Sequence, residues 1–591
     1  MKWLARLKGS LIIWRRFAPQ LVEHRGAILR VILLSLLVAP LEIARPWTIA
    51  WLFDQALMPV GEAKYEPTFV LWTSVGALLV IVGLRIALEY VRNLSTVSVG
   101  HSVTRSLRHR IFSHLIRLSP SFHQKHKSGD LLMRLMGDVP MLKSMLVEST
   151  VELISRFALV GGTLAVMFWK DAFLTAVLCL TLPLFVIAVK WISSHITIAV
   201  RKQRRKEGEL ADYLHEAIAG ADAIQSLGRS EHVIHEFARS NRRSVRAGMK
   251  VAKLSAKMGA SVESMIILAT ALTLLLGGFR AIDGTMSAGV LFVFYSYVRG
   301  LLKPVRSASK HAERISKGTA CGERILAVLD STIEVADAPN AMLAPTEIKT
   351  LSYESVSHEY DEGVAALQDV NLEFKSGELT GVFGVSGAGK STLAALAVRL
   401  FDPSSGIVMV NGVDIREFEV ASLRDRIGLC MQENLLFGES IAENLALGKP
   451  DSSTEEHWAA LERAGADEFV RSLNDGLDTV LGSQGKGLSG GQRRRLVLAR
   501  TLLRESQILI VDEPFSGLDR IVAERVHRTL RDYARTRVVV VIAHEHEHLP
   551  RFDRVVFLEA GYISASGSHE ELLRDSSSYK KIIEDPIGAS C

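Results

Sequence analysis

Residues 371–395 read NLEFKSGELTGVFGVSGAGKSTLAA, and this stretch decides the fold of the C-terminal half of the chain. A strand, a glycine-rich loop and the start of a helix follow one another in it. The loop Gly384–Ser391 fits the phosphate-binding pattern G-x-x-x-x-G-K-S without exception. Its glycines let backbone N–H groups curl around phosphate oxygens, and the helix N-terminus adds its dipole. We therefore predict an α/β domain that binds a nucleotide.

Two side chains of this loop carry most of its chemistry. Lys390 neutralises phosphate charge, and the Ser391 hydroxyl is expected to ligate Mg²⁺. The remaining predicted nucleotide contacts lie in the loop and directly after it, at Gly384, Val385, Ser386, Gly387, Ala388, Gly389 and Thr392. A nucleotide and Mg²⁺ are thus the expected ligands of this domain.

A second stretch, QILIVDEP at 507–514, supplies the other half of the predicted site. Its four apolar residues favour a buried strand that ends at two carboxylates. Asp512 is placed to join the Mg²⁺ shell, and Glu513 to act on the attacking water. Phosphoryl transfer depends mainly on positioning and on offsetting charge, so a carboxylate at this place is the natural general base.

Between these stretches lies LSGGQ at 488–492, followed by RRRLVLAR, and its last residue precedes Asp512 by twenty positions. With this segment the chain resembles the ABC transporters, whose signature motif it matches. The resemblance implies that the nucleotide is ATP. It also implies that the signature of one cassette closes over ATP bound to the phosphate loop of another, through Leu488, Ser489, Gly490, Gly491 and Gln492.

Four further roles are implied by the resemblance. Tyr360 matches the aromatic residue that stacks on adenine, and Gln432 matches the glutamine that joins Mg²⁺ to the attacking water. The segment Ser516–Asp519 resembles the D-loop, with Asp519 as a nucleotide-site residue, although the family more often has alanine where Gly517 stands. His544 matches the switch histidine that contacts the γ-phosphate.

The run HEHEH at 544–548 has a second interpretation, because alternating histidines can bind a metal. Its position after the apolar run VVVVIA already accounts for His544 as the switch histidine. We expect His546 and His548 to be solvated.

Bulk composition places a membrane half before a soluble half. Of the 591 residues 48% are hydrophobic and 23% charged, and the long apolar runs are confined to about residues 27–306. The net charge of +6 suggests nucleic acid at first sight. The cations crowd the segments between apolar runs, however, which is a membrane-topology signal, and we expect no nucleic-acid partner.

Six stretches are long and apolar enough to cross a bilayer of about 30 Å. They are 27–53, 69–89, 148–169, 172–194, 259–279 and 286–306. The loops 91–147 and 195–258 hold nine and thirteen Lys or Arg, whereas each of the other three loops holds one. The positive-inside rule therefore places both termini and both long loops in the cytosol. Much of these two loops is compatible with helices that continue beyond the membrane.

Glu42 and Arg45 are the deepest ionisable residues of the predicted spans, bracketed by Pro40 and Pro46. Such residues are functional candidates, because a charge inside the bilayer is costly. The alternative is that they pair with each other or with a neighbouring helix. Nothing in the sequence names a substrate.

We therefore predict an all-α six-helix transmembrane domain followed by an α/β P-loop ATPase domain, the ABC cassette. Its parts are an amphipathic segment on the cytosolic membrane face (1–25), the transmembrane domain (26–312), a helical linker (313–345) and the cassette (346–591). The arrangement resembles the exporter-type (type IV) half-transporters. We expect the protein to lie in the inner membrane of a bacterium.

The function implied is ATP-driven export or flipping of an amphipathic substrate such as a lipid, drug, peptide or conjugate. Every motif is present in one chain, so a homodimer is favoured over pairing with a paralogous half-transporter. Two alternatives stay open: an importer, for example of a metal chelate, that uses the exporter fold, and a membrane-tethered ATPase regulator that transports nothing.

Overall fold

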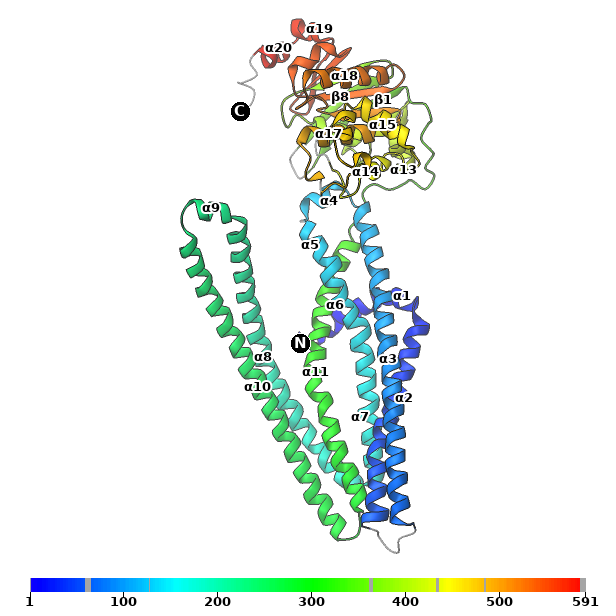
Figure 1. Cartoon of the computed structure of the whole chain (residues 1–591), viewed down its shortest axis with the longest axis vertical. Coiled ribbons are helices and arrows are strands. Elements are labelled where there is room, and N and C mark those ends of the chain that lie inside the picture. The colour runs from blue at the N-terminus through cyan, green and yellow to red at the C-terminus, as the bar shows by residue number, and fades with distance from the viewer. Residues whose placement is uncertain are drawn as a thin grey trace. The chain divides into compact units, whose positions relative to one another are not determined.

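The computed structural model describes residues 2–58, 65–126, 128–360, 365–431, 435–482 and 485–584. The chain divides into two compact units (Figure 1). The first comprises Met1–Leu115 and Gly129–Asp330, and the second comprises Ile116–Ser128 and Ser331–Cys591. Each unit has its own hydrophobic core.

Helices build the first unit. They are α1 (Lys2–Val22), α2 (Arg25–Leu52), α3 (Pro67–Arg117), α5 (Ser128–Met133), α6 (Val139–Lys143), α7 (Thr150–Lys170), α8 (Ala172–Ala219), α9 (Ala221–Ser226), α10 (Ser230–Ile282) and α11 (Ala288–Leu329). Short π-helical turns join α5, α6 and α7 and extend the end of α2. Each of the six predicted spans overlaps one of the long helices α2, α3, α7, α8, α10 and α11.

Four helical segments among the described residues are long and apolar enough to cross a membrane: Arg25–Leu57, Pro67–Arg117, Ser128–Lys170 and Ser230–Ile282. Shorter apolar segments begin α8 and α11, at Ala172–Thr181 and Ala288–Leu301. Helices α3 and α10 have 51 and 53 residues. At about 1.5 Å per residue they are more than twice as long as a bilayer is thick. The helices therefore continue beyond the membrane, as predicted.

Helix α2 and helix α11 approach each other closely where α2 ends and α11 begins, and polar contacts join them there. The carboxylate of Asp54 accepts hydrogen bonds from the Ser287 hydroxyl at 2.8 Å and from the Gly289 N–H at 2.7 Å. A side chain at Gly289 would place its Cβ only 2.3 Å from the Ala50 carbonyl oxygen, so only glycine lets α11 approach α2 here. Helix α10 packs along α8 in the same unit (Figure 1).

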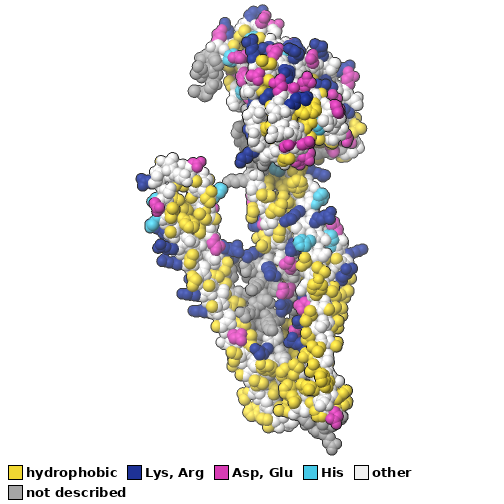
Figure 2. Space-filling model, in the orientation of Figure 1, with side chains coloured by type: hydrophobic (Ala, Val, Ile, Leu, Met, Phe, Trp, Pro, Cys, Tyr) yellow, Lys and Arg dark blue, Asp and Glu magenta, His cyan; other side chains and the backbone are white. Residues whose placement is uncertain are grey.

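The surface of this unit matches a membrane environment. Large apolar side chains stand exposed along the helices, among them Trp72 and Trp169, and Figure 2 shows many such side chains there. Lys and Arg side chains instead gather over the parts of α8 and α10 that lie toward α9 (Figure 2). Exposed apolar area of this extent is typical of a lipid-facing surface.

Helix α1 buries part of its apolar surface within the first unit, whereas its Leu11 and Ile12 side chains are exposed. Ile13 and Phe17 are almost fully buried. A Cβ at Gly322 of α11 would lie 2.8 Å from Ile13 Cγ2, so the two helices approach closely. Arg16 forms an ion pair with Asp330, at the end of the same unit. The N-terminal helix is therefore fixed to the C-terminal part of α11.

The second unit contains two sheets. Their strands are β1 (Thr350–Glu359), β2 (Ala365–Lys375), β3 (Leu379–Phe383), β4 (Ser405–Val410), β5 (Val413–Asp414), β6 (Ile427–Cys430), β7 (Ile508–Asp512), β8 (Val538–Ala543), β9 (Arg554–Glu559) and β10 (Tyr562–Gly567). An antiparallel sheet has the order β2-β1-β4-β5, and a mostly parallel sheet has the order β10-β9-β3-β8-β7-β6. The predicted P-loop strand and the predicted strand before Glu513 are β3 and β7, separated by β8.

The second unit also contains helices. They are α4 (Pro120–Lys125), α12 (Lys390–Ala397), α13 (Val420–Arg426), α14 (Ile441–Ala446), α15 (Thr454–Arg463), α16 (Asp467–Arg471), α17 (Gly490–Leu503), α18 (Arg520–Ala534), α19 (His569–Asp575) and α20 (Ser577–Glu584). Helix α4 comes from the first long loop, and its Ser121 hydroxyl lies 3.5 Å from the Glu334 carboxylate.

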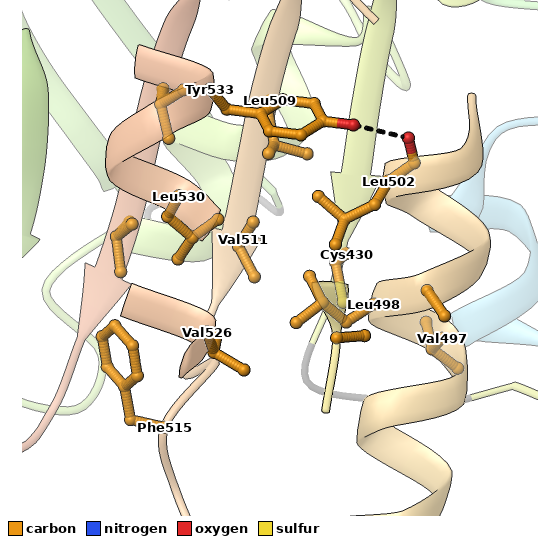
Figure 3. Packing of buried hydrophobic residues seen from close by; sticks show 14 of the residues in the cluster. Cys430, Val497, Leu498, Leu502, Leu509, Val511, Phe515, Val526, Leu530 and Tyr533 are labelled. Carbon is orange, nitrogen blue, oxygen red and sulfur yellow. Dashed lines mark hydrogen bonds between the residues drawn. The ribbon is translucent and has the colours of Figure 1, made fainter. Parts of the chain in front are cut away.

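One core fixes the elements that carry the motifs (Figure 3). Leu498 of α17, Val511 of β7 and Leu530 of α18 are almost fully buried in it. The Tyr533 hydroxyl of α18 donates a hydrogen bond of 2.9 Å to the Leu502 carbonyl oxygen of α17. Because buried side chains of this kind are close-packed, the start of α17 and the end of β7 are held in a fixed relation.

Candidate nucleotide-binding site

The glycine-rich loop joins β3 to α12 and has the backbone of a phosphate-binding loop. Gly387 and Gly389 have φ angles of +82° and +103°, which favour glycine. A Cβ at Gly384 would lie 2.1 Å from the Leu558 carbonyl oxygen, and one at Gly389 would lie 2.4 Å from that of Ala366. Backbone therefore surrounds the loop closely, and Gly384 and Gly389 cannot be replaced without a shift of main chain.

Lys390 begins α12 and lies folded across the loop. Its side chain is buried, and its Nζ donates hydrogen bonds to the carbonyl oxygens of Gly384 at 2.8 Å and Val385 at 2.9 Å. Burial lowers the pKa of Lys390, while the nearby charges of Asp512 and Glu513 act in the opposite direction. The ammonium group is thus a desolvated cation, which a phosphate group would bind strongly.

Asp512 ends β7 as a buried carboxylate. Desolvation, followed by repulsion from Glu513, raises its pKa to about 6, although Lys390 and Arg494 act against this rise. Mg²⁺ prefers hard oxygen ligands, usually one or two from the protein besides substrate phosphates. The Asp512 carboxylate and the Ser391 hydroxyl provide such oxygens, so the residues present fit this ion.

Glu513 follows β7 in a strained backbone conformation. Its φ angle is +49°, unusual for a residue with a side chain, and its N–H donates to the Ile542 carbonyl oxygen at 2.9 Å. Its carboxylate oxygens lie 3.5 Å from His544 Nε2 and 3.9 Å from Arg494 Nη2. Strained backbone concentrates at functional sites, and here it aims a carboxylate between two nitrogen-bearing side chains.

His544 follows β8 next to Glu513. Burial, followed by the charge of Lys390, lowers its pKa, and Glu513 acts against this effect. The imidazole is therefore neutral at pH 7 and able to donate one hydrogen bond.

The last histidine of the run HEHEH, His548, differs from our prediction that it is solvated. His548 is not solvated, because it packs on Phe515 with ring centroids 4.4 Å apart and lies 3.5 Å from Glu545.

Tyr360 lies at the end of the described part of its segment, against the phosphate-loop helix. Its hydroxyl shares a hydrogen bond of 3.0 Å with the Thr392 hydroxyl. Its ring meets Phe401 edge to face with centroids 5.4 Å apart, and it is half-buried. These contacts fix the ring beside the loop while leaving part of it exposed.

The signature segment forms the N-terminus of α17. The Ser489 hydroxyl accepts a hydrogen bond from the Gln492 N–H at 3.2 Å, and the Gln492 side chain accepts one from the Ser489 N–H at 2.9 Å. This reciprocal capping box fixes the first turn of the helix. A Cβ at Gly490 would meet nothing within 4 Å, so this helix end is open. An open helix N-terminus of this kind suits a phosphate group.

The D-loop runs directly beside the signature helix. Arg494 of α17 donates to the Ser516 carbonyl oxygen at 2.7 Å, and Asp519 caps α18 by accepting from the Val522 N–H at 2.9 Å. Gly517 has a φ angle of +72°. The departure from alanine at this position therefore has a backbone cause, since glycine adopts this conformation at low cost.

The structure brings together some of the predicted residues and leaves others apart. Lys390, Asp512, Glu513 and His544 form one cluster with the phosphate loop. Within the described residues, no hydrogen bond or ion pair joins 488–492 or Asp519 to the loop 384–392. Gln432 lies outside the described residues.

Arg494 is a residue of this cluster that our sequence reasoning missed. Its only sequence signal is its place in the run RRR at 493–495 after the signature. One of its terminal nitrogens faces Glu513 and the other binds the D-loop, so one guanidinium ties the signature helix to both. The planar, two-sided geometry of arginine suits this bridging role.

We predict that Arg494→Gln lowers ATP turnover about tenfold or more, because a charge-assisted contact that orients Glu513 is lost. Nucleotide affinity should stay unchanged, since Arg494 does not contact the phosphate loop. Arg494→Lys should restore little, because one ammonium group cannot make both contacts. Steady-state kinetics of these variants beside the exposed-surface control Arg528→Gln would test this. A change in affinity as large as that in turnover would contradict it.

Comparisons with known proteins agree with this geometry. A family model described as the ABC transporter transmembrane region matches residues 29–305, and one described as ABC transporter matches residues 367–516. An ATP-dependent lipid A-core flippase of Chromobacterium violaceum is 30% identical and aligned over 97% of both chains. The protein belongs to the ABC transporter family. This ABC transporter carries its transmembrane region and its ATP-binding cassette in one chain.

Two further relatives extend over nearly the whole chain. An ABC transporter ATP-binding protein of Bacillus subtilis, YfiC, is 28% identical over 98% of this chain and 94% of its own. The solved structure of a bacterial Atm1-family ABC exporter with ATP bound has a TM-score of 0.78 and 25% identity, covering 97% of this chain and 98% of its own. The protein is thus a multi-pass membrane protein with the fold of an ABC exporter.

Proposed function

We propose that two copies of this chain form an ATP-driven exporter or flippase of an amphipathic substrate in a bacterial inner membrane, with both termini in the cytosol. The observation that carries this proposal is the division of the nucleotide site. Within the described residues no hydrogen bond or ion pair joins the loop 384–392 to the signature 488–492, although the backbone of each suits a phosphate group. A second copy would supply the missing half to each site.

Each residue of the site has a role in the proposed hydrolysis. Lys390 and the loop N–H groups bind the phosphates, and Tyr360 stacks on the adenine. Ser391 and Asp512 would hold Mg²⁺, which supplies charge neutralisation when bound. Glu513 accepts the proton of the attacking water as a general base, and neutral His544 donates a hydrogen bond toward the γ-phosphate.

The other predicted residues complete the site from their own positions. Gln432 is assigned to the Mg²⁺ and water contacts from its sequence match. Ser489 and Gly490 present the N-terminus of α17 to the phosphates of the ATP held by the partner subunit. Asp519 stands at the start of α18 on the D-loop beside this helix end. Closure on ATP and opening after hydrolysis would then drive alternating access in the transmembrane unit.

Trans complementation tests the proposed dimer. Gly490→Asp places a carboxylate at an open helix end, where it repels phosphate without a steric clash. Homodimers of this variant, and homodimers of Lys390→Ala, should be inactive. A mixed dimer purified through two different tags should regain ATPase activity, because one of its two sites pairs an intact loop with an intact signature. Inactive mixed dimers would contradict the shared site.

Transport itself requires a vectorial measurement. Inside-out vesicles that contain the protein should move a labelled amphipathic compound away from the ATP-containing side. The Glu513→Gln protein serves as the matched control in the same vesicles. Movement toward the ATP-containing side would contradict export.

A further inference from the structure

Two adjoining cavities lie within the first unit. One has a volume of about 510 Å³ and lies among α2, α3, α7 and α11. The other has a volume of about 460 Å³ and is lined by α2, α7, α10 and α11. Glu42, Leu159 and Arg156 line both of them. We call the first the paired-charge cavity and the second the cationic cavity, after the charged side chains that line them.

The paired-charge cavity is internally compensated. Its lining carboxylates are each matched by a cation: Glu42 by Arg85, Glu89 by Arg92 at 3.3 Å, Glu148 by Lys143 at 2.6 Å and Glu152 by Arg156 at 3.1 Å. Glu42 therefore pairs with a neighbouring helix and not with Arg45. A ligand gains little by bringing a charge into this cavity, because each carboxylate already has its partner.

The cationic cavity has charges left over. Besides Glu42 and Arg156, which are already paired, it is lined by Arg45, Arg299 and Glu263. No carboxylate of the described residues forms an ion pair with either of these two arginines. Arg299 Nη1 instead donates to the Tyr295 hydroxyl at 2.9 Å. Two cations against one carboxylate leave an excess of one positive charge in this cavity.

Ionisable groups within membrane spans are costly and mark binding sites or ion paths. The lining also includes the apolar side chains of Val160, Val262 and Ile266, beside polar ones such as Thr163 and Ser296. We propose that this cavity binds the anionic group of an amphipathic cargo, a phosphate or a carboxylate, at Arg45 and Arg299, with the apolar part of the cargo on these apolar side chains. This proposal rests on the proposed transport function and specifies the class of its substrate.

Matched single-chain probes test the charge preference directly. The full-length protein in phosphatidylcholine nanodiscs, without ATP, is titrated with dodecyl phosphate, laurate, dodecylphosphocholine, dodecyl maltoside and dodecyltrimethylammonium, and binding is followed by tryptophan fluorescence. We expect the two anionic probes to bind about tenfold or more tightly than the others, because each charge-assisted contact is worth that factor. The first two probes separate phosphate from carboxylate selectivity.

Variants that lose positive charge and a variant that loses negative charge should change the preference for anionic probes in opposite directions. Arg45→Gln with Arg299→Gln should abolish the preference for anionic probes, whereas Glu263→Gln should increase it. Arg30→Gln, an exposed cation of the same helix as Arg45, is the matched control and should change nothing. The Glu263→Gln arm keeps the proposal testable even if the double variant does not fold.

Equal affinity for the zwitterionic, neutral or cationic probes would overturn the proposal, as would an anionic preference that survives loss of both arginines. Binding is measured without nucleotide, so it does not depend on hydrolysis. Failure of the proposed function would appear separately, as ATPase activity that survives in Glu513→Gln or as absence of vectorial transport. The two failures are therefore distinguishable.

Discussion

Replacement of Glu513 by glutamine should slow ATP hydrolysis by roughly 10²–10⁴-fold, the range typical of a lost general base. Glutamine keeps the size and hydrogen-bonding capacity of the side chain but accepts no proton from the attacking water. The strained backbone at this residue and the contacts to His544 and Arg494 hold the carboxylate in one place, so a neighbouring acid cannot substitute for it. Single-turnover ATPase kinetics would measure the effect.

Nucleotide affinity should survive this change, since Lys390 and the loop N–H groups make the phosphate contacts. ATP would then hold two cassettes together without being consumed, and size-exclusion chromatography of the detergent-solubilised protein should show a stable closed dimer with bound ATP. Glu547→Gln is the matched control, because that carboxylate is exposed and lies in the segment that follows His544. Turnover close to that of the unmodified protein would remove Glu513 from its assigned role.

The sequence predicted the phosphate loop and the strand before Glu513 because local chemistry determines them. A loop that must let Gly389 adopt a φ of +103° beside the Ala366 carbonyl oxygen tolerates no side chain there, so the glycine appears in the sequence itself. The buried strand Ile508–Asp512 likewise appears as an apolar run that ends in acids. Long apolar helices are visible for the same reason.

Contacts between distant segments were not predictable in this way. Arg494 lies near Glu513 only because β7 and α17 share one core, and helical sequence alone does not show which of three consecutive arginines faces inward. The burial of His548 against Phe515 and the pairing of Glu42 with Arg85 likewise depend on tertiary packing. A sequence pattern shows which face of a helix is apolar, but it does not show which element packs against that face.

Replacement of Lys390 by alanine should act on an earlier step and weaken ATP binding itself by about 10- to 100-fold, the range expected for loss of a charge-assisted hydrogen bond to phosphate. In the structure the Lys390 ammonium group is buried and bound to two carbonyl oxygens of the loop, from which a phosphate oxygen would draw it. Its loss also removes the cation that offsets the charges of Asp512 and Glu513. Equilibrium titration with a fluorescent ATP analogue would measure the change.

Lys375→Ala is the matched control, because this exposed lysine of β2 forms only a surface ion pair of 3.0 Å with Glu373. The two active-site variants then differ in kind: Glu513→Gln binds ATP and fails to hydrolyse it, whereas Lys390→Ala fails to bind it and so should form no closed dimer. Undiminished ATP affinity in Lys390→Ala would contradict the phosphate-loop assignment. Because ATP binding precedes closure and hydrolysis, the double variant should resemble Lys390→Ala alone. If the two residues acted independently, the double variant would instead combine both defects.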